Sequence, residues 1–219
     1  DNGRLSGTSR DGGTETINLR YDSTGAMAVT DAAANTSTFF LDHRGLPAKV
    51  QNPLTNALFF RYDSDFNLAS LTDPAGRSYS FAYDAKGNLA KSTDASGHPA
   101  KFAYETSLNR LASLTDARGN TTRFANDVLG NLNSIAYPNG TLEGWRHDAA
   151  GNAVTWTNRR GQPIVYDFNT NGQPTRKVYP DGREIDFFYS SRQQLTNITD
   201  SIQGTTTLGY DTRNFLTNI

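Results

Sequence analysis

The sequence predicts an all-β protein built from tandem antiparallel β-hairpins, and three observations support this fold class. A Tyr-Asp pair, or a divergent form of it, returns about every 21 residues along the 219-residue chain. Each interval contains two turn sequences rich in Asp, Asn and Gly, and an apolar residue stands two positions before the first residue of each pair. A fixed period of this length is typical of a stacked array, in which each unit buries its apolar face against its neighbours.

The recurring pair divides the chain into ten units, whose pairs are 20, 21, 21, 21, 22, 21, 19, 23 and 21 residues apart. We therefore expect residues 1–219 to form a single array of about ten repeats, and the partial units at its ends indicate a fragment of a longer array. The pairs are Tyr21-Asp22, Leu41-Asp42, Tyr62-Asp63, Tyr83-Asp84, Tyr104-Glu105, Asn126-Asp127, His147-Asp148, Tyr166-Asp167, Tyr189-Ser190 and Tyr210-Asp211.

The unit at residues 83–104 illustrates each element in order. A first turn at 83–88 contains Asp84, whose side chain can accept hydrogen bonds from the backbone ahead, and Gly87, which adopts positive φ without strain. Residues 89–93 are expected to form an outgoing strand, 94–97 a second turn, and 99–104 a return strand into the next pair. Roughly twenty short strands should result.

The return strand indicates which face of the sheet is buried. Side chains two positions apart lie on the same face of a strand, so the apolar residue and the first residue of the pair are neighbours in each unit. Stacked along the array, these side chains would form two parallel ladders, which we expect to be the core. The predicted ladder residues are Leu19, Tyr21, Phe39, Phe60, Tyr62, Phe81, Tyr83, Phe102, Tyr104, Phe124, Trp145, Ile164, Tyr166, Phe187, Tyr189, Leu208 and Tyr210.

Apolar residues on the outgoing strand are three apart, as in Leu68 and Leu71 or Leu132 and Ile135. In a regular strand this spacing places them on opposite faces. Either both faces are partly covered or a β-bulge intervenes. A helical interpretation fails because turn sequences recur every five to eight residues and leave no window long enough for a helix.

Composition argues against several classes of partner. The chain has 21 basic and 22 acidic residues and no cluster of Lys and Arg in the sequence, so no nucleic-acid partner is predicted. Its longest apolar run, residues 57–60, is far too short for a membrane span. The absence of cysteine excludes disulfides and thiolate metal sites. No cofactor is expected.

Residues capable of chemistry recur without forming a recognisable site. His43, His98 and His147 lie in different units and are expected to be structural rather than metal ligands. No Gly-x-Ser-x-Gly nucleophile motif occurs, and an aspartate repeated in eight of the ten units argues against catalysis, so we predict no enzymatic activity. Turn capping explains these aspartates better than calcium binding, because the calcium-binding β-roll pattern is absent. They are Asp22, Asp42, Asp63, Asp84, Asp127, Asp148, Asp167 and Asp211.

The pattern Tyr-Asp-x-x-Gly-x-Leu followed by Thr-Asp-x-x-Gly, seen best at residues 83–97 and 62–76, resembles the YD or Rhs (rearrangement hotspot) repeat family. This family occurs in bacterial polymorphic toxins, in the shell component of insecticidal Tc toxins and in teneurins. The resemblance covers the whole chain and implies a hairpin ribbon that spirals to form part of a hollow shell. The chain departs from the pattern where the Gly of the first turn is missing, at Phe66, Leu108, Gln193 and Asn214.

The resemblance implies a structural shell segment of a toxin-type protein that helps encapsulate a C-terminal effector. The partners would be the rest of the parent shell and the encapsulated polypeptide cargo, and the protein would be secreted or at the cell surface, with bacterial export. Bacterial members end in a segment with aspartate-dependent self-cleavage, which is not found in this sequence. Asp73 belongs to an ordinary second turn and takes no protease role.

A carbohydrate-binding or adhesion module is the alternative function. Exposed aromatic side chains such as Trp156 and Tyr179 would stack on the sugar rings of glycans. Trp145 is the weaker candidate because it belongs to the predicted ladder. Trp156 stands one residue before Thr157 and is a candidate for the opposite face.

Overall fold

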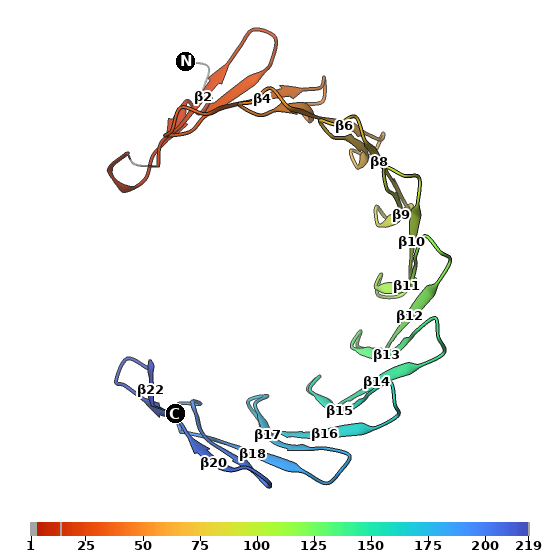
Figure 1. Cartoon of the computed structure of the whole chain (residues 1–219), viewed down its shortest axis with the longest axis vertical. Helices are drawn as coiled ribbons and strands as arrows, with labels where there is room; N and C mark the ends of the chain where they lie inside the picture. The colour runs from red at the N-terminus through yellow and green to blue at the C-terminus, as the bar shows by residue number, and fades with distance from the viewer. Residues whose placement is uncertain (1–3, 14, 219) are drawn as a thin grey trace. The chain divides into compact units, whose positions relative to one another are not determined.

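The computed structural model describes residues 4–13 and 15–218, and the fold is all-β, as predicted. These residues contain twenty-two β-strands and one short 3-10 helix, η1 (Asp11–Gly13). No helix in the described part of the chain is long and apolar enough to cross a membrane. The chain divides between Phe102 and Ala103 into two compact units, and within each unit the strands follow one another in chain order (Figure 1).

In the first unit, each strand pairs antiparallel with the next, which gives a continuous meander. Strand β10 joins it through residues 99–101. The strands are β1 (Gly7–Thr8), β2 (Ile17–Tyr21), β3 (Met27–Thr30), β4 (Thr36–Leu41), β5 (Pro47–Gln51), β6 (Ala57–Tyr62), β7 (Leu68–Thr72), β8 (Ser78–Tyr83), β9 (Leu89–Thr93) and β10 (Pro99–Tyr104).

The second unit has the same topology from β11 to β20, and β21 and β22 form a separate two-stranded sheet. Its strands are β11 (Leu111–Thr115), β12 (Thr121–Asn126), β13 (Leu132–Ala136), β14 (Leu142–His147), β15 (Ala153–Thr157), β16 (Pro163–Phe168), β17 (Pro174–Val178), β18 (Glu184–Tyr189), β19 (Leu195–Asp200), β20 (Gly204–Thr207), β21 (Gly209–Tyr210) and β22 (Leu216–Asn218).

A tight turn with a side-chain acceptor reverses the chain about every ten residues. In the turn at Asp63, the backbone N–H of Asp63 donates to the carbonyl of Asn67 at 2.9 Å, and Asp63 Oδ1 accepts from the N–H groups of Asp65 and Asn67 at 2.9 Å. One carboxylate oxygen therefore satisfies two donors that the turn would otherwise leave without a partner. This is the capping role predicted from sequence.

The fourth residue of the turn has positive φ, which favours glycine, as at Gly87 with φ of 81°. The prediction that Leu108 takes the place of this glycine is wrong. The turn closes from Glu105 N–H to the carbonyl of Arg110 and contains one extra residue, so the positive φ falls on Asn109. Six residues other than glycine adopt positive φ among those described: Ala34, Thr55, Phe66, Asn109, Gln193 and Asn214.

A β-bulge explains why the apolar residues of the outgoing strand are three positions apart. In β6 and β7, Tyr62 pairs with Leu68 and Phe60 pairs with Leu71, with a register shift between Arg61 and Tyr62. The bulge adds one residue to β7, so both leucines lie on the same face as their partners. Of the two alternatives that the sequence left open, the bulge is the one observed.

The bulge and the turn also account for the variation in repeat length. Between β2 and β3, Tyr21 pairs with Met27 and Leu19 with Val29 without a register shift, so this repeat lacks the bulge residue and is 20 residues long. The repeat that begins at Tyr104 contains the longer turn and has 22 residues.

The assignment of Tyr166-Asp167 as the recurring pair of this repeat is wrong. Strand β16 continues to Phe168, the register shift lies between Asp167 and Phe168, and Asn169 opens the turn. Asn169 Oδ1 accepts from Asn171 N–H at 3.0 Å and from the N–H of residue 173 at 3.1 Å. The equivalent pair is therefore Phe168-Asn169, which lies 21 residues from its neighbours on both sides. Asp167 is an exposed strand residue and caps no turn.

The core is shallow, because a single sheet has no second layer to cover it. Among the described apolar side chains only Ala26 and Ile164 are fully buried, with 4% and 8% of their surface exposed. On the return strands, half-buried and exposed positions alternate, as in β8 and β12. One face of each sheet therefore carries the apolar contacts and the other faces solvent.

Candidate functional site

The predicted ladder residues lie on the less exposed face of the sheet. Ile164 is buried and the others are half-buried. Cross-strand pairs join this face to the outgoing strands, such as Phe39 with Val50 and Phe187 with Ile198. Leu208 lies between β20 and β21 rather than on a strand, and its N–H donates to the carbonyl of Thr196 at 2.8 Å.

Tyrosine hydroxyls of the ladder connect consecutive repeats. The Tyr62 hydroxyl donates to the carbonyl of Pro47 at 3.1 Å, and that of Tyr83 donates to the carbonyl of Leu68 at 3.0 Å. Tyr189 and Tyr210 make the same bond to residues 174 and 195, at 2.8 and 3.0 Å. Each acceptor lies fifteen residues earlier, on the outgoing strand of the preceding repeat. Burial raises the pKa of the Tyr83 and Tyr189 hydroxyls, which keeps them protonated as donors.

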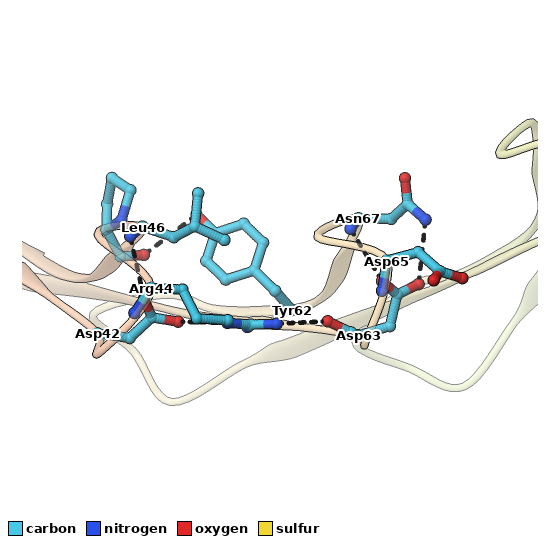
Figure 2. A network of polar contacts seen from close by, with 8 residues as sticks. Asp42, Arg44, Leu46, Tyr62, Asp63, Asp65 and Asn67 are labelled. Atoms are coloured by element: carbon cyan, nitrogen blue, oxygen red, sulfur yellow. Dashed lines mark hydrogen bonds and ion pairs between the residues drawn. The ribbon is translucent and has the colours of Figure 1, made fainter.

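Side chains at the turns provide a second connection (Figure 2). Arg44 Nε binds Asp42 Oδ2 at 3.2 Å within its own turn, and Arg44 Nη1 donates to the carbonyl of Asp63 in the next repeat at 2.7 Å. In the second unit, Gln173 Nε2 similarly donates to the carbonyl of Gln193 at 2.9 Å. A polar side chain therefore links the turns of two consecutive repeats at each of these places.

Turn carboxylates are engaged by their own turns. Asp84 accepts from Asn88 Nδ2 and N–H at 2.9 Å and from Lys86 N–H at 2.8 Å. The Asn88 side chain and then its backbone N–H hold the pKa of Asp84 below its usual range. Asp73 binds Arg77 Nε at 2.6 Å and the N–H groups of Ala75 and Arg77. A carboxylate stabilised in its charged form is poorly suited to act as a general acid or base near neutral pH.

No group of three or more His, Asp and Glu side chains in the described part of the chain is arranged to hold a metal ion. His98 Nδ1 lies 3.2 Å from Asp94 Oδ2 within a single turn. His43 is exposed in the turn between β4 and β5, and His147 ends β14, where it pairs with Ala153. The three histidines therefore belong to separate local environments.

Trp156 does not face away from the ladder. It pairs directly with Trp145 on β14 and with Ile164 on β16, and directly opposed residues share one face. Trp145, Ala153, Trp156, Tyr166 and Phe168 line an open hollow of about 300 Å³. Trp156 Nε1 is buried without a hydrogen-bond partner, so its N–H is not accessible to a ligand.

Tyr179 opens the turn between β17 and β18 and is half-buried. Its ring lies 4.4 Å from Lys177 Nζ and 5.6 Å from the Arg183 guanidinium carbon. The two cations therefore occupy positions that a stacking sugar would need.

Comparisons with known proteins agree with the repeat and the fold. The family model described as Teneurin YD-shell matches residues 75–218. No curated protein sequence matches the chain.

Three solved structures resemble the chain at 15% sequence identity, and each match covers 93% of this chain and 12% of the other. The crystal structure of TcdB2-TccC3-Cdc42 has a TM-score of 0.59. The crystal structure of TcdB2-TccC3-TEV and the Photorhabdus luminescens Tc holotoxin pore with mutated TccC3 both have 0.58. At this identity the likeness concerns the fold, and the chain spans about an eighth of the length of these proteins.

Proposed function

Because the chain belongs to the teneurin YD-shell family and is a shell segment, we propose that it forms part of a wall that encloses a polypeptide cargo in an extracellular protein. The main support is the uniformity of the repeats. Apolar cross-strand pairs and turns capped by a side-chain oxygen recur along the chain, and the same tyrosine bond occurs at Tyr62, Tyr83, Tyr189 and Tyr210. The described residues hold no cluster arranged to bind a metal ion, and a surface of recurring structural contacts suits passive confinement better than catalysis on one substrate.

Enclosure requires more repeats than this chain contains. About twenty strands at roughly 4.8 Å spacing give a ribbon of about 95 Å. A cargo of about 100 residues has a radius of gyration near 13 Å, which corresponds to a girth of about 105 Å. The remaining wall would come from the rest of the parent shell, which is the partner we propose.

Protease protection in the parent protein tests this function. We would replace Phe81 and Phe124 by Asp on the ladder face, and Ala82 and Ala125 by Asp on the exposed face as the matched control. The ladder variant should expose the cargo to trypsin, whereas the control should leave it protected. If trypsin cleaved the cargo as fast in the unaltered parent as in the ladder variant, enclosure would be contradicted.

The wall itself is proposed to be non-catalytic, since its carboxylates serve the same structural role in successive turns. Glycosidase and peptidase substrates should show no turnover with the purified chain. Turnover that is lost on replacing a single aspartate would overturn this part of the proposal.

A glycan-binding module is a second candidate, favoured by the aromatic hollow around Trp156. Aromatic faces stack on sugars, although the buried Nε1 cannot add a hydrogen bond. Glycan binding that is abolished by Trp156→Ala while Val154→Ala retains it would support this candidate. Absence of binding to a glycan panel would eliminate it.

A further inference from the structure

The strands of the first unit carry only basic charges on the face opposite the ladder. Pairing defines this face, since Arg61 lies opposite Ser70, and Lys91 lies opposite Ala82 on one side and Lys101 on the other. The described acidic residues of this unit lie outside the strands. The five charged residues of this face, which we call the basic face, are Arg20, Lys49, Arg61, Lys91 and Lys101.

Within the described residues, no ion pair neutralises the charge of the basic face. Four of its cations are exposed and Lys49 is half-buried, and in the described residues none of the five forms an ion pair. The ion pairs of this unit lie within turns, at Asp42, Asp73 and Asp94. These carboxylates therefore pair with cations of their own turns rather than with the five cations of the basic face.

Lys91 and Lys101 are directly opposite each other on β9 and β10. Like charges in this position destabilise a sheet. An acidic ligand placed over both ammonium groups would remove the repulsion, so binding and folding would reinforce each other at this point.

Hydroxyl groups and aromatic rings lie between the cations. Arg61 lines an open hollow of about 540 Å³ with the hydroxyl residues Ser70, Thr72, Ser78, Ser80 and Thr93. Asp94 also lines this hollow, and its Oδ1 accepts hydrogen bonds from the N–H groups of Ser96 and His98 in its own turn. On the neighbouring strands, Lys49 Nζ lies 4.7 Å from the Phe40 ring and 5.9 Å from the Phe59 ring. Phe59 is 48% exposed, so the face offers apolar surface as well as charge.

We propose that the basic face binds an acidic segment of polypeptide. Its carboxylates would accept hydrogen bonds from the cations and hydroxyls, and its apolar side chains would contact Phe40 and Phe59. From β2 to β10 the face extends about 38 Å at roughly 4.8 Å per strand. Five cations over this length are sparse for nucleic acid, which carries a phosphate about every 3.4 Å along each strand. Mixed apolar and basic surface fits a polypeptide better.

Binding of a labelled acidic peptide to the 219-residue chain tests the proposal. The probe is a fluorescein-labelled peptide of about 12 residues that alternates Glu with Phe or Gly, long enough to span the face when extended. Its control has Gln in place of Glu. Fluorescence anisotropy should show binding of the Glu peptide that weakens as salt is raised, and much weaker binding of the Gln peptide.

Variants locate the binding on the basic face. The double change Arg61→Gln and Lys101→Gln should weaken binding by about five- to tenfold. The control Arg118→Gln and Arg192→Gln removes two exposed cations from turns of the second unit and should leave affinity unchanged. Lys101→Glu should also weaken binding while it preserves or raises the unfolding temperature, because it replaces a repulsive pair with an attractive one.

Three results would overturn the proposal: equal affinity for the Glu and Gln peptides, equal loss of affinity in the control variant, or tighter binding of oligothymidine than of the acidic peptide. The last would assign the face to nucleic acid. Because the assay uses the 219-residue chain without the parent protein or its cargo, these results are independent of the protease-protection test.

Discussion

Tyrosine and phenylalanine are not equivalent at the first position of the recurring pair. The hydroxyls of Tyr62, Tyr83, Tyr189 and Tyr210 each donate to a carbonyl in the preceding repeat. Leu41 and Phe168 stand at the same position and have no such donor. Individual repeats are therefore attached to their neighbours with different strength.

We expect Tyr83→Phe to lower the free energy of unfolding by about 1 kcal/mol, because it removes one hydrogen bond to the half-buried carbonyl of Leu68. Tyr79→Phe on the same strand and face is the control, since no hydrogen bond from the Tyr79 hydroxyl is found among the described residues. Urea unfolding followed by circular dichroism would compare them. Equal losses in both variants would contradict a role for the Tyr83 hydroxyl.

Thr55 adopts φ of 67°, a conformation that is strained for a β-branched residue. Thr55→Gly should raise stability by about 0.5–1 kcal/mol, since relief of strain exceeds the added entropy of the unfolded chain. The reverse change, Gly76→Thr, should be destabilising although the space around Gly76 is open. Thermal unfolding of both variants checks the prediction, and a destabilised Thr55→Gly would refute it.

Residue types at the turns could be predicted because Asp and Gly act locally. The error at Tyr166-Asp167 arose where a second Tyr-Asp pair stands two residues before the true position, which Phe168 and Asn169 occupy. Asn accepts the same two backbone hydrogen bonds as Asp, so the repeat does not require a carboxylate. The regular interval of 21 residues was the signal that located the turn.

At the scale of strands and turns, the hairpins followed from the sequence but the faces of the outgoing strands did not. Pairing of Trp145 with Trp156 and of His147 with Ala153 adds one residue to β15 and reverses the alternation of its side chains. No particular residue type marks the position of the bulge, so the sequence does not show which face each residue of the outgoing strand occupies. The strand pairing shows it. This explains why Trp156 lies on the ladder face.

Because the ladder side chains are only half-buried, truncating one of them should reduce stability less than truncating a fully buried side chain. Phe81→Ala should destabilise the chain by about 1–3 kcal/mol, less than the 3–5 kcal/mol typical of a fully buried phenylalanine. Phe59→Ala on the exposed face is the matched control and should cost less. Hydrogen exchange should show loss of protection first in β7 and β9, because contacts in an array are local. A uniform loss across the chain would contradict this.

For the whole molecule, the turn aspartates make stability sensitive to acid. Hydrogen bonds lower the pKa of Asp84, Asp116 and Asp148 through Asn side chains, and Arg183 with the backbone N–H of Ile202 lowers that of Asp200 to about 2. A lowered folded-state pKa contributes stability that is present above the unfolded value, near 4, and is lost as pH falls through the folded value.

We therefore expect the unfolding temperature to fall as pH decreases from about 4 to about 2, with little change caused by these groups between about 5 and 7. Asp200→Asn should be less stable at neutral pH and should lose less stability on acidification, because it has no charge to neutralise. Circular dichroism melting curves across this range provide the measurement. An unchanged acid profile in Asp200→Asn would exclude Asp200 from the effect.

Each hairpin sets its own register, so a change of length in one repeat does not shift the strand pairing of the next. The repeat that begins at Tyr21 lacks the bulge and is one residue shorter, and the repeat that begins at Tyr104 has a longer turn and is one residue longer. In both cases the following strands pair in the usual register. Duplication or loss of 21 residues at the DNA level would likewise insert or remove a complete hairpin with its own capping carboxylate. Unequal recombination would thus change the number of hairpins in the array without altering the structure of any one hairpin.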